Sequence, residues 1–262
     1  MFTGVGQRYN ILFQVILTVL AVIFLLPLLV MLSVSLRGQG LGNYTAVLQH
    51  PMIPRFFLNS VLVTSCTIVI VYVITILSAY AFSKLPIRGK TVLFSALLVG
   101  LLLPAVAIMV PLFFTIRAMG LMNNYLALIL PYAAFALPFT TLLARNFFDG
   151  LPNELLDAAR IDGCNSFTAL VRVVMPLSRP ISVVVVLWTF LSAWNEYFLV
   201  LLFMQNDQMK TLTHAPQFFV GVYTQDTGKI FATLVLISLP IMVLYLALQR
   251  YFESGMTSGA LK

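Results

Sequence analysis

The chain has 262 residues, of which 61% are hydrophobic and only 9% are charged, and its mean hydropathy is +1.01. A water-soluble domain cannot cover its surface with so few ionised groups, so a soluble fold is excluded and a membrane protein is predicted. The formal net charge of +7 is explained by attraction to anionic inner-leaflet lipid, and no nucleic-acid partner is expected.

Six apolar stretches are long enough to cross a hydrocarbon layer about 30 Å thick as helices. They cover residues 11–36, 61–82, 92–114, 126–143, 181–204 and 230–251. These spans account for nearly the whole chain, so we predict an all-α fold with one transmembrane domain over 1–262. Little remains for an extramembrane domain, and any energy source or soluble receptor is expected to be another polypeptide.

The positions of the basic residues predict the orientation of the chain in the membrane. If both termini are cytosolic, the inner segments hold ten of the fifteen Lys and Arg residues and the outer segments hold five. This two-to-one excess agrees with the positive-inside rule. We therefore predict a multi-pass protein of the cytoplasmic (inner) membrane with both termini in the cytosol.

Prolines recur inside the predicted spans, and they are Pro27, Pro104, Pro111, Pro131, Pro138 and Pro240. Each removes a backbone donor and is expected to kink its helix. The pairs in spans three and four are each seven residues apart, so both kinks of a pair fall on one face. Two interpretations stay open: packing bends in a bundle, or spans that line a pathway and flex with it.

A polar insert separates spans four and five, and on the predicted orientation this loop over 149–180 faces the cytosol. Pro152 suits the first turn of a helix, and Gly163 suits a left-handed C-cap. Asn165 or Ser166 then caps a second helix that ends at Pro176 and Pro180. Its predicted apolar stripe consists of Phe167, Leu170, Val171 and Val174.

Two arrangements of this insert are compatible with its sequence. In the first, the two helices form a rigid knob that protrudes from the membrane and fits a groove in another protein. The small residues Ala158 and Ala159 would let a partner backbone approach closely, while Leu155 and Leu156 offer apolar contact. In the second, the helices lie flat on the bilayer and their arginines snorkel.

The insert resembles the cytosolic motif of ABC importer permeases, which reads EAA, three residues, Gly, nine residues, then I-x-L-P. Here Asp157-Ala158-Ala159 is followed after three residues by Gly163, and after nine more by Val173-Val174-Met175-Pro176. All fixed spacings match, although Asp157 replaces the glutamate of the motif. In that family the knob is a coupling helix that docks in a cleft of an ATP-hydrolysing subunit.

Other short pieces resemble the carbohydrate permeases of the maltose and glycerol-phosphate type. They are Asn59-Ser60 entering span two, "AWNEYF" over 193–198, and the tail over 249–262. The resemblance implies the fold of a type I ABC importer permease with six helices. It also implies a second, similar permease, two ATPase subunits and an extracytoplasmic sugar-binding protein as partners.

The resemblance assigns the contact with the ATPase to ten residues: Glu154, Leu155, Asp157, Ala158, Ala159, Arg160, Asp162, Gly163, Phe167 and Pro176. It implies no catalytic residue and no cofactor in this chain, because ATP and magnesium are used by the partner subunit. The chain itself is therefore not expected to be an enzyme.

A candidate substrate pathway lies in span five. Glu196 is the only acid within a span, and an intramembrane carboxylate is costly enough to suggest function. Trp194, Asn195 and Tyr197 are adjacent, and an indole beside an amide and a carboxylate suits sugar hydroxyls. The alternative is that Asn195 and Glu196 link helices while Trp194 belongs to an interfacial belt.

Two other functions remain as alternatives. An ion-coupled secondary transporter would use Glu196 as its titrating group, although no internal repeat of the kind found in such proteins is visible. A membrane-embedded enzyme is disfavoured because no catalytic constellation is present. His50 and His214 lie in separate loops without metal-ligand spacing, so no metal site is expected.

Overall fold

The computed structural model describes residues 7–221 and 225–259, and it describes side chains over 11–221 and 225–249. The family-like tail over 249–262 lies largely outside the described side chains, and its last three residues lie outside the described residues altogether. The described part is almost wholly helical, as predicted, and its one isolated β-bridge joins Val220 to Gln225.

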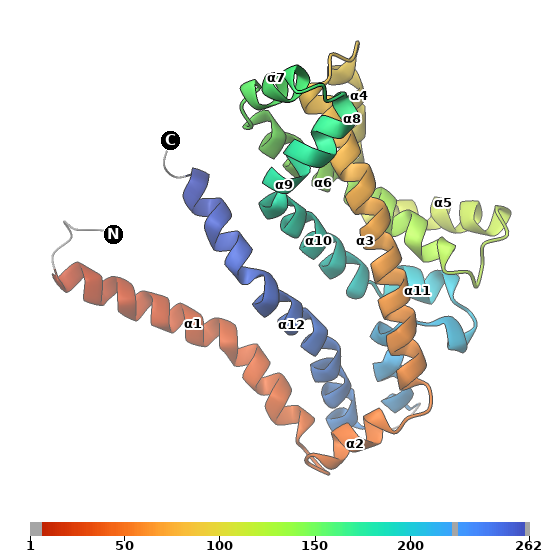
Figure 1. Ribbon diagram of the computed structural model, residues 1–262. Helices are drawn as coiled ribbons and strands as arrows, with labels where there is room; N and C mark the ends of the chain where they lie inside the picture. Colours follow the sequence, from red (N-terminus) through yellow and green to blue (C-terminus); the bar gives the residue numbers. More distant parts are fainter. Residues whose placement is uncertain (1–6, 222–224, 260–262) are drawn as a thin grey trace. The chain divides into compact units, whose positions relative to one another are not determined.

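The helices follow one another along the chain as shown in Figure 1. The longer ones are α1 (Gln7–Ser35), α3 (Ile53–Lys84), α4 (Lys90–Val99), α5 (Ala105–Ala118), α6 (Leu126–Asp149), α10 (Arg179–Trp194) and α12 (Thr227–Gly259). The shorter ones are α2 (Gly42–Leu48), η1 (Gly100–Leu102), α7 (Glu154–Ile161), α8 (Ser166–Ala169), η2 (Leu170–Val174), α9 (Met175–Leu177), α11 (Phe198–Phe203), η3 (Asp207–Met209) and η4 (Leu212–Phe219).

Four helices, α1, α3, α6 and α12, are long and apolar enough to cross a membrane. Two further helix pairs, 90–102 with 105–118 and 166–177 with 179–194, qualify if each bent pair is one span, which gives up to six spans in the described residues. The predicted third and fifth spans, 92–114 and 181–204, are each interrupted in the structure. The third is divided into α4 and α5, and the fifth is divided into α10 and α11.

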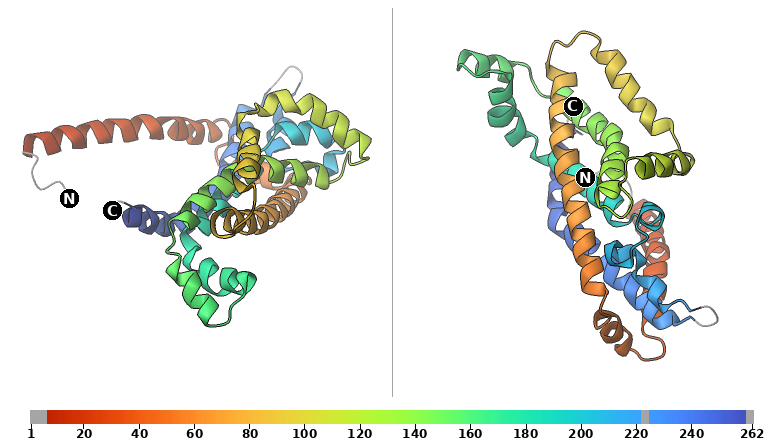
Figure 2. Two further views of the ribbon diagram at one scale, coloured as in Figure 1. Left: turned by 90° about the horizontal axis from the view of Figure 1, so that it is seen from above. Right: turned by 90° about the vertical axis from the view of Figure 1, so that its right-hand side faces the viewer.

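The break in the third span lies at Leu103 and Pro104, where a simple kink was predicted. Both residues are extended, with ψ angles of 120° and 125°. The proline ring disfavours helical geometry at the preceding residue, so the helix stops and restarts rather than bending gradually. The two halves are bent by 101° relative to each other. The right-hand view of Figure 2 shows this bend between α4 and α5. Pro111, Pro131 and Pro138, in contrast, lie within helices.

The chain divides into two compact units, and the first comprises Met1–Ile53 and Ala215–Leu239. Its turn after α1 is held by the buried Asn43, whose Nδ2 donates to the carbonyl oxygens of Ser35 (2.9 Å) and Arg37 (2.8 Å). Gly228 lies against this turn. A Cβ at Gly228 would come within 2.6 Å of both the Arg37 carbonyl oxygen and Asn43 Nδ2. The turn and the start of α12 therefore fit together only because residue 228 lacks a side chain.

The Gly228→Ala variant is expected to be destabilised by about 1–3 kcal/mol, the usual cost of overpacking a filled site. Thermal unfolding of the purified protein measures this loss. Gly150→Ala is the matched control, because its added Cβ would lie 3.4 Å from the nearest atom, the Phe147 carbonyl oxygen. Equal unfolding temperatures for the two variants would contradict the close fit at Gly228.

The second unit comprises Pro54–His214 and Pro240–Lys262. Within it, α3 packs on α6 through small side chains, including the buried Ala79, Ala133 and Ala136. The Thr75 and Thr140 hydroxyls hydrogen-bond between these two helices at 2.7 Å. Small residues allow helices to approach closely in a membrane, and hydroxyl pairs then link them. This framework carries both the polar insert and the cavity described below.

The segment after α11 is tied to the first turns of α3. Asn59 Nδ2 donates to the carbonyl oxygens of Gln208 (2.9 Å) and Lys210 (2.8 Å), and Ser60 Oγ accepts from the Leu212 backbone at 2.8 Å. The Tyr125 hydroxyl completes the network by donating to Asn59 Oδ1 at 2.7 Å. Asn59 and Ser60 therefore act as structural ties between segments about 150 residues apart.

Candidate functional site

The first half of the polar insert is the helix α7. Glu154 and Asp157 lie in its first turn and Arg160 in its last, where each charge complements the helix dipole. Arg160 Nη1 also donates to Asp157 Oδ1 at 2.9 Å in an exposed ion pair. Pro152 precedes the helix instead of lying in its first turn, so that detail of the prediction is wrong.

A sharp corner at Gly163 follows α7, as predicted. Gly163 has a φ of +81°, a left-handed conformation that favours glycine. The backbone N–H of Gly163 donates to the Arg160 carbonyl oxygen (3.0 Å), and the N–H of Cys164 donates to the Ala159 carbonyl oxygen (2.9 Å). These two hydrogen bonds are the pair of a Schellman motif. They satisfy two carbonyl groups at the helix end and fix the direction in which the chain leaves.

The second half of the insert begins at Asn165, whose Oδ1 accepts from the Thr168 backbone at 2.9 Å. Helical structure continues through α8, η2 and α9 and ends at Leu177, between the two prolines that were predicted to end it, Pro176 and Pro180. The segment η2 is a π-helical turn in which the Met175 N–H donates to the Leu170 carbonyl. This wider turn precedes Pro176, whose ring would clash with the Arg172 carbonyl in a regular α-helix.

One face of the insert is buried in the second unit. Its buried residues are Leu156, Ala159, Ala169, Leu170 and Val174. They share one hydrophobic cluster with residues of α3, α6 and α10: Ile76, Ala79, Tyr80, Ala144, Phe148, Ile181 and Val185. The insert is therefore closely packed onto the membrane helices. Because close-packed cores transmit displacement, the insert and these helices should move together as one rigid body.

The opposite face of the insert is exposed and partly apolar. Ile161 is 87% exposed and Phe167 is 67% exposed, and Leu155, Ala158 and Val171 are also exposed. Phe167 and Val171 thus lie outside the buried stripe in which they were predicted. Ala158 and Ala159, which were expected to act as a pair toward a partner, point in different directions, and only Ala158 is accessible.

The entry to the insert is fastened by Lys84 at the end of α3, a residue that sequence reasoning did not single out for this role. Lys84 Nζ donates to the Leu151 carbonyl oxygen (2.7 Å) and to Asn153 Oδ1 (2.9 Å). Next to it, Ser83 Oγ donates to Asp149 Oδ1 at 2.6 Å. The end of α3 is therefore hydrogen-bonded to the loop that leads from α6 into α7.

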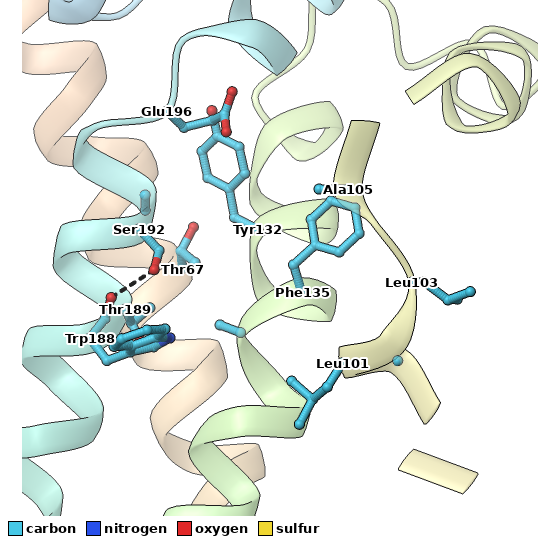
Figure 3. A pocket seen from close by; sticks show the side chains of 13 residues that line it. Thr67, Leu101, Leu103, Ala105, Tyr132, Phe135, Trp188, Thr189, Ser192 and Glu196 are labelled. Carbon is cyan, nitrogen blue, oxygen red and sulfur yellow. Dashed lines mark hydrogen bonds between the residues drawn. The ribbon is translucent and has the colours of Figure 1, made fainter. Parts of the chain in front are cut away.

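A cavity of about 320 Å³ lies within the second unit, between α3, η1, α5, α6 and α10 (Figure 3). Its lining comprises Thr67, Gly100, Leu101, Leu103, Ala105, Tyr132, Phe135, Ala136, Trp188, Thr189, Ser192, Ala193 and Glu196. Leu101, Leu103, Ala105 and Phe135 make one wall apolar, whereas hydroxyls, the indole and the carboxylate gather along α10 and its end. The broken third span supplies part of this wall.

Glu196 and Tyr132 stand at the same end of the cavity, with the tyrosine ring directed toward the carboxylate (Figure 3). Glu196 lies in the break between α10 and α11, where its Oε1 accepts from the Leu199 N–H at 2.8 Å and so caps α11. The Tyr132 hydroxyl is buried and has no hydrogen-bond partner among the described residues. The site therefore combines a carboxylate with a donor that is left unsatisfied.

Trp188 and Ser192 are one helical turn apart on α10 and face the cavity together. The Trp188 ring lies 4.3 Å from that of Phe139 at an angle of 40°. Ser192 Oγ donates to the Trp188 carbonyl oxygen at 2.9 Å, which leaves the hydroxyl oxygen able to accept. The arrangement offers an aromatic surface and several hydrogen-bonding groups to a polar ligand.

Of the four predicted pathway residues, only Glu196 lines this cavity. Trp194 is buried and stacks on Phe190 at 5.3 Å, while the exposed Asn195 donates to the Leu191 carbonyl oxygen at 2.9 Å. Tyr197 stacks on His214 at 4.4 Å. The spacing of Trp188, Ser192 and the break at 196 along span five could have indicated the correct face, but nothing in the sequence marks Tyr132.

Both histidines pack against aromatic rings. His50 stacks on Phe218 at 4.3 Å in the first unit. His214 is buried under Tyr197 in the second, and its burial together with the charge of Lys210 lowers its pKa to about 4. Its imidazole is therefore neutral at pH 7. Within the described residues, His, Cys, Asp and Glu form no group that could hold a metal ion.

Comparison with known proteins identifies similar sequences. The family profile described as "Binding-protein-dependent transport system inner membrane component" matches residues 72–258. The probable ABC transporter permease protein YurM of Bacillus subtilis is 38% identical over 87% of this chain and 72% of its own length. The sulfoquinovosyl glycerol transport system permease protein SmoH of Agrobacterium fabrum is 34% identical over 86% and 79%.

The trehalose/maltose transport system permease protein MalG of Thermococcus litoralis is 33% identical over 85% of this chain and 81% of its own. Among solved structures, a chain of a bacterial ABC transporter that imports the acidic polysaccharide alginate has a TM-score of 0.82. It is 22% identical, and the likeness covers 96% of this chain and 99% of that one. This likeness confirms the predicted fold.

Proposed function

This chain belongs to the family of binding-protein-dependent transport system inner membrane components, and we propose that it is the permease subunit of a carbohydrate importer. The family is one of transport components rather than enzymes. The observation that carries the carbohydrate assignment is the agreement between sugar-transporting relatives and a cavity lined by an indole, hydroxyls and a carboxylate. The chain would form half of the translocation pathway.

The rigid insert would be the site at which an ATPase subunit docks. Its exposed face offers Leu155, Ala158, Ile161 and Phe167 around the charged pair of Asp157 and Arg160. Apolar side chains beside a few charges suit a groove in a partner protein. The other assigned residues, Glu154, Ala159, Asp162, Gly163 and Pro176, would act by shaping and packing the insert. Closure of the ATPase subunits would then move the insert and the helices packed on it together.

The assembly would contain a second permease, two ATPase subunits that use ATP and magnesium, and an extracytoplasmic binding protein. Membrane lipid would surround the apolar helices. The insert and both termini would face the cytosol. Purification of the tagged chain from its host membrane tests this assignment, and stoichiometric recovery of an ATPase subunit is the expected result. Recovery of the folded chain without an ATPase would contradict it.

An ion-coupled transporter that titrates Glu196 is not favoured. The family match points to a binding-protein-dependent system, and the Glu196 carboxylate already has a structural role at the start of α11. Uptake that collapses when ATP is depleted, with the proton gradient maintained, is the expected result for the importer. The opposite dependence would restore the alternative.

The Lys84→Met variant is expected to lower transport per ATP hydrolysed by roughly tenfold, because two hydrogen bonds from a charged donor to the insert are lost. The measurement is sugar uptake and ATP hydrolysis by the reconstituted importer. Lys84→Arg retains a charged donor and should keep most of the coupling, whereas Arg88→Met removes an exposed cation from the same turn and should change little. Unchanged coupling in Lys84→Met would contradict the role given to this residue.

A further inference from the structure

We infer that the cavity between α3, α6 and α10 is a saccharide site that admits uncharged sugars and rejects acidic ones. This inference rests on the proposed function and narrows it. The relatives and the structural neighbour transport both kinds, since trehalose and maltose are neutral whereas alginate is acidic. The charge of the saccharide is therefore a property on which members of this fold differ.

The first observation is the unpartnered Tyr132 hydroxyl. Tyr132 is 7% exposed, and its ring points into the cavity toward Glu196 (Figure 3). A buried hydroxyl without a partner is uncommon, because it forgoes the hydrogen bonds that it would make in water. A ligand oxygen at this end of the cavity would accept from it. The unused O–H donor of Tyr132 thus marks the position of a ligand hydroxyl.

The second observation is the charge of the lining. Among the described residues that line the cavity, Glu196 alone carries a formal charge, and it is negative. A carboxylate accepts several hydrogen bonds and so suits the donor hydroxyls of a neutral sugar. A uronate or sulfonate placed beside it would meet a like charge with no lysine or arginine in the described lining to compensate. Such a like-charge contact is strongly unfavourable away from bulk water.

The third observation is the surface offered by Trp188. The indole lines the cavity, rests against Phe139 and is 42% exposed. An accessible aromatic ring can stack on an apolar face of a sugar ring. The cavity volume of about 320 Å³ lies at the lower end of the range for small-molecule sites. The site therefore fits a short stretch of a saccharide.

A protection experiment tests the inference. The complete importer, with its partner permease and ATPase subunits, is placed in lipid nanodiscs, because glycoside detergents would compete with sugars. A thiol introduced into the cavity by Ser192→Cys is labelled with a maleimide in the presence of maltose, trehalose or melibiose. The acidic probes are disaccharides of the same size that end in glucuronate. The native thiol of Cys164, which lies in the polar insert and does not line the cavity, reports any non-specific effect.

We expect at least one neutral disaccharide to protect the introduced thiol, at a concentration roughly tenfold or more below that of any acidic one. Glu196→Gln keeps the acceptor for Leu199 but removes the charge, so it should reduce this difference to about twofold. Tyr132→Phe should weaken neutral protection by about fivefold without changing the preference. Asp226→Asn removes a carboxylate elsewhere and should leave both values unchanged.

Equal or better protection by the acidic sugars would overturn the inference, as would an absence of protection by every neutral sugar. An undiminished preference in Glu196→Gln would also overturn it. Uptake by the same importer separates this failure from failure of the proposed function. ATP-dependent uptake of an acidic sugar would contradict the charge preference but leave the carbohydrate importer intact, whereas an importer that carries no saccharide would contradict both.

Discussion

The Gly163→Val variant is expected to insert its membrane helices normally but to lose nearly all transport. Residue 163 has a φ of +81°, which costs an ordinary L-residue about 1–2 kcal/mol and a β-branched residue more. Relaxation of this strain would break the two hydrogen bonds of the corner and redirect α8 relative to α7. Uptake into cells, together with co-purification of the ATPase subunit, measures the effect.

The matched control is Gly163→Asn. An added Cβ at residue 163 would meet no atom of the part of the chain that the structure describes within 4 Å, so crowding does not separate the two variants. Asparagine adopts the left-handed conformation far more readily than valine does, and it should retain most of the transport. Parental uptake in Gly163→Val, or equal loss in both variants, would show that the backbone geometry of the corner is not what matters.

The Phe167→Asp variant is expected to fold like the parent protein but to release the ATPase subunit. Phe167 is 67% exposed, so its removal leaves no cavity in this chain. An aromatic residue buried at the centre of an interface commonly contributes 2 kcal/mol or more, and its loss should weaken docking by roughly 30-fold. The affinity of the purified chain for its ATPase subunit, measured against salt concentration, checks this value.

Ser166→Asp provides the control for this substitution. It adds the same charge one residue earlier, at an exposed position in the first turn of α8 where an acid is favourable. Docking should remain within about twofold of the parent value, because the apolar contact is retained. If both variants lose the ATPase equally, added charge rather than the Phe167 ring would be responsible. If neither does, the exposed face of the insert is not the docking surface.

The sequence alone was sufficient to predict the approximate positions of the apolar helices, although not the interruptions of the third and fifth spans. Membrane thickness sets their length, and few other structures satisfy backbone hydrogen bonds in lipid. It also predicted the corner at Gly163, because only glycine adopts that conformation without strain. These features depend on local composition and spacing, which a single sequence displays directly.

Features that depend on packing could not be predicted in the same way. Phe167 and Leu170 follow one helical period, yet one is exposed and the other is buried. Val171 and Val174 were likewise expected on one stripe, but the π-helical turn η2 runs through them and only Val174 is buried. The same limit applies to Lys84, whose contacts in the loop lie 67 and 69 residues away. No spacing rule connects such distant positions.

The cavity residues were only partly predictable from the sequence. The sequence correctly marked Glu196, because an acid among apolar residues is conspicuous, but it grouped that residue with its immediate neighbours. Those neighbours face away from the cavity, and the polar and aromatic residues that accompany Glu196 come from α3, α6 and earlier turns of α10 instead. Adjacent positions in a broken helix do not share a face.

The hydrogen bond between Glu196 and the Leu199 N–H links two equilibria. Whatever draws the carboxylate away from that amide frays the first turn of α11, and whatever frays the turn frees the carboxylate. Thermodynamic reciprocity then requires each event to change the other by the same factor. Hydrogen exchange at the Leu199 amide should therefore report occupancy of the cavity, even though leucine itself never touches what is bound there.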